Sequence, residues 1–268
     1  MPELPVALTI AGFDSSAGAG LQADLLTFHN QGYHCLTAAT AIVVETPLEV
    51  QSVTALDHHI LQQQVALLLN TYPITAIKIG LLASPEQIFV LRDLLLHHPA
   101  PIVIDPVGIS STGTSLQQPH TASALLQHLA PLATLLTPNF PEAKTLLQSP
   151  QMNSPQEAAL NLWKQTGSNI LLTGGHHGSE NEFIDLLIKN GTPSHFSAPA
   201  ITSATSLHGT GCVLSSAIAA KLGQGEHLKD AIENARRYLR KTMSNHLTFP
   251  HSQPLLALNH HPSTKNNS

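Results

Sequence analysis

Apolar runs and helical periods alternate along nearly the whole chain, as they do in proteins built from repeated β-α units. Residues 6–11 read as a buried strand. A small-residue loop at 12–20 follows, and then a helix with Leu21, Leu25 and Phe28 on one face. The alternation continues through predicted strands at 36–44, 76–82, 102–105, 132–136 and 170–172, and predicted helices at 57–69 and 85–96. The pattern predicts an α/β fold around a central, mainly parallel sheet.

Local signals mark the ends of the later elements. Ser154, with Glu157 three residues on, is typical of a helix N-terminus. Residues 189–191 (Lys-Asn-Gly) predict a hairpin between two short apolar strands. A helix is expected from the loop at 209–212 through residue 220, and a second over 228–243. We expect a single domain over residues 1–249 and a disordered polar tail over 250–268.

Composition argues against several functional classes. The chain has 268 residues, 42% of them hydrophobic, and a formal net charge of -5 with scattered basic residues, so nucleic-acid binding is not expected. Without an apolar stretch of membrane-spanning length, we expect no membrane partner and a cytoplasmic protein. Two cysteines make no disulfide framework. Pairs such as His58-His59 and His97-His98 raise the question of a metal site, but most of the histidines have no cysteine or carboxylate at ligand spacing, so a metal role for these pairs is not expected.

The strongest chemical signal is His208-Gly209-Thr210-Gly211-Cys212, directly before a predicted helix. Two glycines there let backbone N–H groups converge on an anion at the positive end of the helix. Such a nest suits a transferred phosphoryl group. A thiol at a helix N-terminus is expected to have a lowered pKa, so Cys212 is a candidate general base. The alternative is a glycine-rich turn with a buried cysteine.

Two further loops supply candidate ligands. Asn139 and Glu142 lie three residues apart after a buried strand, where they can either cap a helix or serve Mg²⁺ beside phosphates. Asp105 ends another apolar strand and is a second candidate for metal or phosphate-side electrostatics. The glycine-rich segment 12–20 lacks the spacing of a dinucleotide fingerprint, and the chain has no Gly-Lys-Ser/Thr phosphate loop.

Together these motifs resemble the hydroxymethylpyrimidine/phosphomethylpyrimidine kinase family of thiamine biosynthesis, in the ribokinase-like superfamily. The match runs in order over residues 6–247. Its motifs are residues 7–12, 18–24, Lys78-Ile79-Gly80, Asp105-Pro106-Val107, 137–139, 141–143, 174–176 and 208–212.

The resemblance implies a three-layer α/β/α fold, ATP and Mg²⁺ as cofactors, and a homodimer. It implies phosphorylation of 4-amino-5-hydroxymethyl-2-methylpyrimidine and of its monophosphate. By matching motifs, the anion hole and catalytic group would be Gly209, Thr210, Gly211 and Cys212. The pyrimidine pocket would include Gly12, Asp24, Glu45, Gly80 and Val107. Nucleotide contacts would come from Asn139, Thr173, Gly175 and His208, and metal contacts from Asp105 and Glu142.

The chain departs from the family pattern around the expected ligands. Glu45 stands where the family has a glutamine, and an ionised carboxylate only accepts hydrogen bonds, unless Glu45 turns to solvent. Gly108 replaces a methionine, which would enlarge the pocket or leave room for another group. The lysines before Ser-Gly and before Gly-Gly-His are absent, the second replaced by Thr173. Lys78 could be a structural cation or a phosphate contact. A kinase for a pyridoxal-like or modified pyrimidine alcohol, and a catalytically silent ligand-binding protein, therefore stay open as alternatives.

Overall fold

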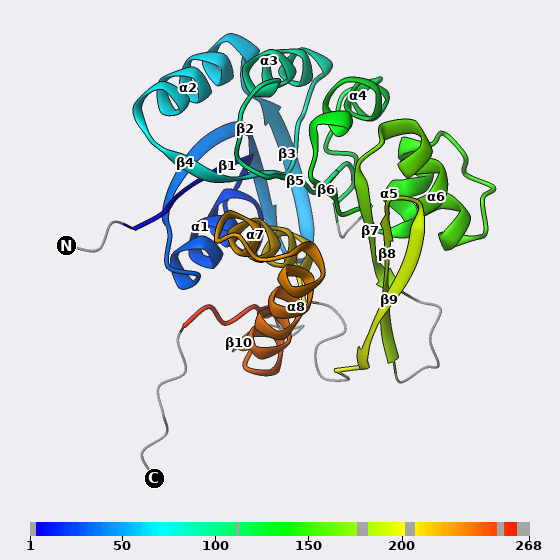
Figure 1. Ribbon diagram of the computed structural model, residues 1–268. Coiled ribbons are helices and arrows are strands. Elements are labelled where there is room, and N and C mark those ends of the chain that lie inside the picture. Colours follow the sequence, from blue (N-terminus) through cyan, green and yellow to red (C-terminus); the bar gives the residue numbers. More distant parts are fainter. Residues whose placement is uncertain (1–3, 111–112, 176–181, 202–206, 251–254, 262–268) are drawn as a thin grey trace.

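The computed structural model describes residues 4–110, 113–175, 182–201, 207–250 and 255–261. Nine strands form one sheet in the order β3-β2-β1-β4-β5-β6-β7-β8-β9 (Figure 1). The strands are β1 (Val6–Asp14), β2 (His34–Thr46), β3 (Glu49–Ala55), β4 (Ile74–Ile79), β5 (Ile102–Ile104), β6 (Leu135–Leu136), β7 (Asn169–Gly175), β8 (Glu182–Lys189) and β9 (Thr192–Pro199). The six strands from β2 to β7 in this order run parallel, whereas β3, β8 and β9 pair antiparallel with their neighbours.

Helices cover both faces of the sheet, giving the expected three layers (Figure 1). One face carries α1 (Gly20–Asn30), α7 (Thr210–Gly223) and α8 (Leu228–Ser244). The other carries α2 (His58–Thr71), α3 (Pro85–Leu95), α4 (Thr121–Ala124), η1 (Leu125–Leu129), η2 (Ala130–Leu132), α5 (Phe140–Leu146) and α6 (Pro155–Thr166).

Strict alternation along the strands explains why both faces are buried. In β4, Ile77 and Ile79 pack into the core under α2 and α3, while Ala76 packs under α7. The intervening Lys78 points to the same face as Ala76, towards α1 and α7, and this places a charged group inside that layer. The buried polar cluster of the site begins there.

Several predicted elements are confirmed, and others need correction. The hairpin turns at Asn190 and Gly191, both at positive φ, as a two-residue connection between twisted strands requires. Leu25, expected on the buried face of α1, is 41% exposed, because Ala23, Asp24 and Thr27 line that face instead. Strand β3 was not predicted. Its side chains alternate between exposed and half-buried, so it lacks an apolar run.

Part of the predicted disordered tail is built into the fold. β11 (Leu255–Ala257) pairs antiparallel with β10 (Leu247–Phe249), and Leu258 is 5% exposed in a cluster with α1 and α8 residues. A short apolar stretch within the polar segment is enough to anchor it. Residues 251–254 and 262–268 lie outside the described residues. Among the helices described, none combines the length and apolarity that crossing a bilayer requires.

Candidate functional site

A cavity of about 270 Å³ lies where the carboxyl ends of the parallel strands meet the start of α7. In open α/β sheets this edge is the usual ligand site, because loops from several strands converge there. The cavity brings together most of the residues predicted from sequence: Gly12, Glu45, Asp105, Val107, Asn139, Glu142, Thr173, His208, Gly209, Thr210, Gly211 and Cys212.

The start of α7 has the geometry expected of an anion nest. Gly209 is the N-cap residue, with φ of 84°, a conformation that favours glycine. A Cβ atom on Gly209 would lie 1.9 Å from the carbonyl oxygen of Gly18, so the loop before α1 packs directly on it. Thr210, Gly211 and Cys212 form the first turn of a 14-residue helix, whose unbonded N–H groups carry partial positive charge. This turn lines the cavity.

The prediction that Cys212 has a lowered pKa is wrong in this structure. Burial raises the pKa of the Cys212 thiol to about 12, against the opposing effect of Lys78 and with the support of the Asp24 and Asp105 carboxylates. Removal from water outweighs the helix terminus here, because the side chain is only 8% exposed. Cys212 therefore holds its proton at neutral pH.

Asp24 is not part of the cavity wall, contrary to the prediction that it binds substrate. It is fully buried in α1, and both of its oxygens accept hydrogen bonds from the Lys78 ammonium at 2.8 Å. Thr9 and Ser216 donate to it at 2.6 and 2.7 Å. Asp24 thus joins β1, β4, α1 and α7 beneath the cavity floor. Of the two roles left open for Lys78, the structural one is seen.

Gly80, another residue predicted from the sequence, also lies outside the wall. A Cβ atom on Gly80 would come within 2.8 Å of the Lys78 ammonium, so Gly80 leaves room for the buried ion pair. Gly175 ends β7 opposite Ile184, and the residues after it are outside the described ones. Nothing in the sequence distinguishes Gly80 from Gly12, which does line the cavity.

Asn139 and Glu142 form a reciprocal capping box at the start of α5. The Asn139 side-chain oxygen accepts from the Glu142 backbone N–H, and Glu142 Oε2 accepts from the Asn139 N–H, both at 2.8 Å. Both residues nevertheless line the cavity, and the cap uses only one carboxylate oxygen of Glu142. Local capping and ligand binding are therefore compatible.

Asp105, which is buried, and Glu142, which is half-buried, place two carboxyl groups on the same cavity. Burial raises the pKa of Asp105 to about 6 despite Lys78 nearby. Burial, and then the charge of Asp105, raise the pKa of Glu142 to about 8. Ser215 donates to Asp105 at 3.2 Å. A divalent cation between such groups would relieve their repulsion and favour their ionised forms.

The cavity is also lined by a group of three neighbouring titratable side chains, Asp14, Glu45 and His208, of which Asp14 was not singled out from the sequence. The His208 Nε2 atom lies 3.5 Å from Asp14 Oδ2, and one polar atom of Glu45 lies within 4.8 Å of both side chains. Glu45 is half-buried and lines the cavity, which is the first of the two orientations left open by the sequence. The signal for Asp14 was its place at the end of the first strand, where such loops meet ligands.

The space beside Gly108 is occupied. A Cβ atom there would lie 2.9 Å from the side-chain oxygen of Gln117, whose amide group donates to the Val107 carbonyl at 3.1 Å. Gln117 therefore fills the volume that a larger residue at 108 would take. The cavity is not enlarged on this side.

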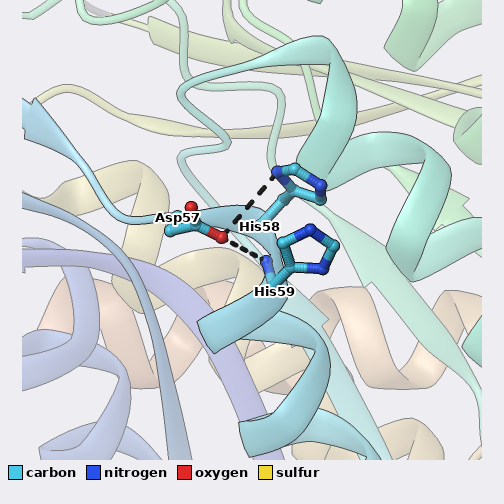
Figure 2. Close-up of side chains that lie close together, drawn as sticks. All are labelled: Asp57, His58 and His59. Carbon is cyan, nitrogen blue, oxygen red and sulfur yellow. Dashed lines mark hydrogen bonds and ion pairs between the residues drawn. The ribbon is translucent and has the colours of Figure 1, made fainter.

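A second group of polar side chains lies at the start of α2 and outside the cavity wall (Figure 2). Asp57 accepts a hydrogen bond from the His59 backbone N–H at 2.7 Å and lies 3.9 Å from His58 Nδ1. The two histidine rings stack with centroids 4.1 Å apart. Asp57, which directly precedes the two histidines, thus serves as the N-cap of the helix.

Comparison with known proteins gives a consistent result. The sequence profile of the phosphomethylpyrimidine kinase family matches residues 14–255. A hydroxymethylpyrimidine/phosphomethylpyrimidine kinase of Haemophilus influenzae is 36% identical over 255 residues, covering 93% of this chain and 94% of that protein. Its counterpart in Rhizobium meliloti is 34% identical over 245 residues, covering 89% and 90%.

Solved structures show the same fold. The phosphomethylpyrimidine kinase of Clostridium difficile superposes with a TM-score of 0.75 at 31% identity, covering 88% of this chain and 98% of that one. A Bacillus subtilis pyridoxal kinase, solved with ADP, superposes with a TM-score of 0.84 at 32% identity, covering 96% and 98%. The predicted ribokinase-like architecture is confirmed.

Proposed function

Because the chain belongs to the phosphomethylpyrimidine kinase family, we propose that it transfers the γ-phosphoryl group of ATP to 4-amino-5-hydroxymethyl-2-methylpyrimidine and to its monophosphate, in thiamine biosynthesis. The observation that carries this proposal is the single cavity that joins the α7 nest, the Asn139-Glu142 cap and the Glu45 wall. A phosphoryl donor and a small heterocyclic alcohol need these features side by side.

The first transfer breaks the bond between the γ-phosphorus and the β,γ-bridging oxygen, which leaves with ADP, and forms a bond to the hydroxymethyl oxygen, whose proton is released to solvent. In the second transfer, a phosphate oxygen of the monophosphate takes the place of the hydroxymethyl oxygen. Negative charge on the passing phosphoryl group is stabilised by the N–H groups of Gly211 and Cys212 and by the positive end of α7. A loose transition state asks little of a general base. We therefore assign Cys212 to the nest itself and not to early proton removal.

The residues present fit Mg²⁺. Asp105 and Glu142 would hold it, since both are carboxyl groups with raised pKa values on the same cavity. The cation would supply charge neutralisation on the phosphate oxygens. In this chain that contribution matters, because among the described residues of the wall only Lys78 and His208 can carry positive charge, and Lys78 is bound to Asp24.

A pyridoxal kinase is the second candidate. The observation that favours it is the closer superposition on pyridoxal kinases, with TM-scores of 0.84 for the proteins of Bacillus subtilis and Staphylococcus aureus, the latter solved with pyridoxal. Pyridoxal also carries a hydroxymethyl group on an aromatic nitrogen ring, so the same cavity suits both alcohols. Sequence similarity to the pyrimidine kinases favours the first candidate.

Initial rates of ADP formation separate these functions. The purified protein is given Mg-ATP and, in turn, the hydroxymethylpyrimidine, its monophosphate, pyridoxal and pyridoxine. We expect both pyrimidines to be turned over with higher kcat/KM than either pyridine. Turnover of the pyridines alone would transfer the assignment to the second candidate, and nucleotide binding without turnover of any alcohol would indicate a silent binding protein.

A homodimer and a cytoplasmic location remain predictions. Phe13 on β1 is the register partner of Ile42 on β2, and both side chains are exposed, as is Val44. A second copy of the chain would remove this apolar strip from water. Light scattering on the purified protein would give a mass of two chains, and a mass of one chain would contradict the prediction.

A further inference from the structure

The Glu45 carboxyl group lines the proposed substrate cavity and accepts no side-chain hydrogen bond among the described residues. Glu45 lies near the end of β2, half-buried, and its backbone N–H is bonded to the Ser15 hydroxyl at 3.0 Å. Among the described residues, no hydrogen bond to its carboxylate oxygens is present, although the side chain lines the cavity. A half-buried carboxylate that points into a binding cavity is available for a bound ligand.

The charges of Asp14 and His208 determine the net charge around Glu45. Asp14 is held as an anion because its oxygens accept from the Ser16 N–H and hydroxyl and from the Gly18 and Ala19 N–H groups, at 2.7 to 3.0 Å. Burial opposes ionisation, but these bonds and His208 lower the pKa of Asp14 to about 2.

His208 lies between the two acids. Burial would lower the pKa of His208, but its contact with Asp14 and the charges of Glu45 and Asp14 raise it above the ordinary value. Burial and then Asp14 raise the pKa of Glu45, against the effect of His208. When Asp14 is negative and His208 carries its second proton, an ionised Glu45 leaves this wall with one uncompensated negative charge.

A neutral aminopyrimidine does not match that wall. Its amino edge presents one N–H donor beside a ring nitrogen that accepts, whereas an ionised carboxylate accepts at both oxygens. Two facing acceptors in a cavity cost about 1–3 kcal/mol, which is about 10- to 100-fold in affinity. One added proton, on the ring nitrogen or on Glu45, turns the contact into a matched pair and leaves the wall neutral.

We propose that the acceptor binds with the uptake of one proton, shared between its ring nitrogen and Glu45, so that the cavity selects a heterocycle able to present two donors or to face a protonated acid. This inference rests on the proposed function, because it concerns the pyrimidine site of that reaction. It makes Glu45 a specificity-determining residue and predicts that affinity for the acceptor falls as pH rises.

Other titratable groups face the same cavity and must be separated from Glu45. They are Lys78 on β4, Asp105 after β5, Glu142 on α5 and Cys212 on α7. Strand β3 brings Glu49 opposite Thr46, one position beyond Glu45. These groups are unchanged in a Glu45→Gln protein, and glutamine supplies one donor and one acceptor of the same shape without a charge.

Calorimetric titration with the hydroxymethylpyrimidine, in buffers of different ionisation enthalpy at about pH 8, measures the proton uptake directly. We expect an uptake near one proton and about a tenfold loss of affinity for each further pH unit. Glu45→Gln should reduce the uptake to near zero and make the affinity independent of pH over this range. Glu49→Gln is the matched control and should behave as the unaltered protein.

Each outcome bears on the inference separately from the proposed function. Binding and turnover of the pyrimidine without proton uptake would overturn the inference and leave the kinase assignment intact. Uptake that persists in Glu45→Gln would also overturn it, since another group would then be the proton site. Failure of the pyrimidine to bind at all would contradict both, and the rates with pyridoxal would show which function replaces it.

Discussion

The ion pair between Asp24 and Lys78 gives the sharpest prediction about stability. Both side chains have no exposed surface, and the ammonium donates to both oxygens of Asp24 at 2.8 Å. Asp24→Asn keeps the shape of the side chain but leaves the ammonium without its closest counter-charge. Breaking a buried pair on one side costs about 3–5 kcal/mol. With a slope of about 3 kcal/mol per M, the urea midpoint should fall by about 1 to 2 M.

The pH dependence of unfolding adds a second, independent readout. Burial alone would lower the pKa of Lys78, but facing Asp24 raises it above its ordinary value. In the unaltered protein this stabilisation is complete below the unfolded pKa of about 10.4 and is lost as pH rises through the higher folded pKa. In Asp24→Asn, burial dominates and the folded pKa falls below the unfolded one. The unfolded state then binds more protons, so stability rises with pH towards about 10.4.

A matched control uses the other well-formed carboxylate pair. Asp185 and Arg236 are 2.8 Å apart but retain 11% and 13% exposure, so Arg236 can regain water when its partner is lost. Asp185→Asn should cost clearly less than Asp24→Asn. Equal urea midpoints for Asp24→Asn and the unaltered protein, or stability that stays flat between pH 8 and 10 in the variant as it does in the parent, would refute the reasoning.

Three further predictions concern the cavity. Gly209→Ala should reduce turnover by about 100-fold or more, because the new Cβ atom would lie 1.9 Å from the carbonyl oxygen of Gly18 and displace the nest. Gly225→Ala is the control, since Gly225 has the same φ of 84° and a Cβ atom there would meet no atom within 4 Å, and this variant should keep its turnover. Equal effects of the two substitutions in enzyme assays would contradict the nest. Glu142→Gln can keep the α5 cap but loses the charge, so the Mg²⁺ concentration that gives half-maximal rate should rise by about tenfold or more. Glu157→Gln, at the equivalent place in the α6 cap, should leave this Mg²⁺ concentration unchanged. An unchanged Mg²⁺ requirement in Glu142→Gln would exclude Glu142 as a ligand. In a Cys35→Ala background, iodoacetamide should label Cys212 far more slowly at neutral pH than it labels free cysteine, because burial raises the pKa of the Cys212 thiol to about 12. Mass spectrometry follows the labelling. Fast labelling would restore the general-base role of Cys212.

The sequence was sufficient for the fold because strand alternation and helix caps are local signals. The capping residues Ser154 and Asn139 and the Asn190-Gly191 turn act within a few residues of themselves, and the structure has them as expected. The sequence did not predict strand β3, because β3 lies at the sheet edge and its side chains are exposed or half-buried. Pairing with β2, and not an apolar composition, defines this strand. The burial of Leu258 was not predicted either, because it depends on contacts with α8, an element earlier in the chain.

The sequence predicted most of the residues that line the cavity, but not how deeply each is buried or which charges are already paired. Motif position placed Cys212, Glu142 and Asp105 on one cavity, yet burial reversed the expected direction of the Cys212 pKa. Asp24 was placed in the pyrimidine pocket because residues 18–24 resemble a motif of the family. Only the three-dimensional contact with Lys78 shows that its charge is already compensated. Burial and pairing come from distant segments, so a linear motif does not report them.

The most direct test of the kinase assignment is a competition in one tube, with the hydroxymethylpyrimidine and pyridoxal at equal concentration and ATP limiting. Mass spectrometry of the products shows which hydroxymethyl oxygen received the phosphoryl group. The structure and the family membership predict that the pyrimidine phosphate predominates and that it continues to the diphosphate when ATP is added. Pyridoxal phosphate as the main product, or ADP without either phosphate ester, would contradict the assignment.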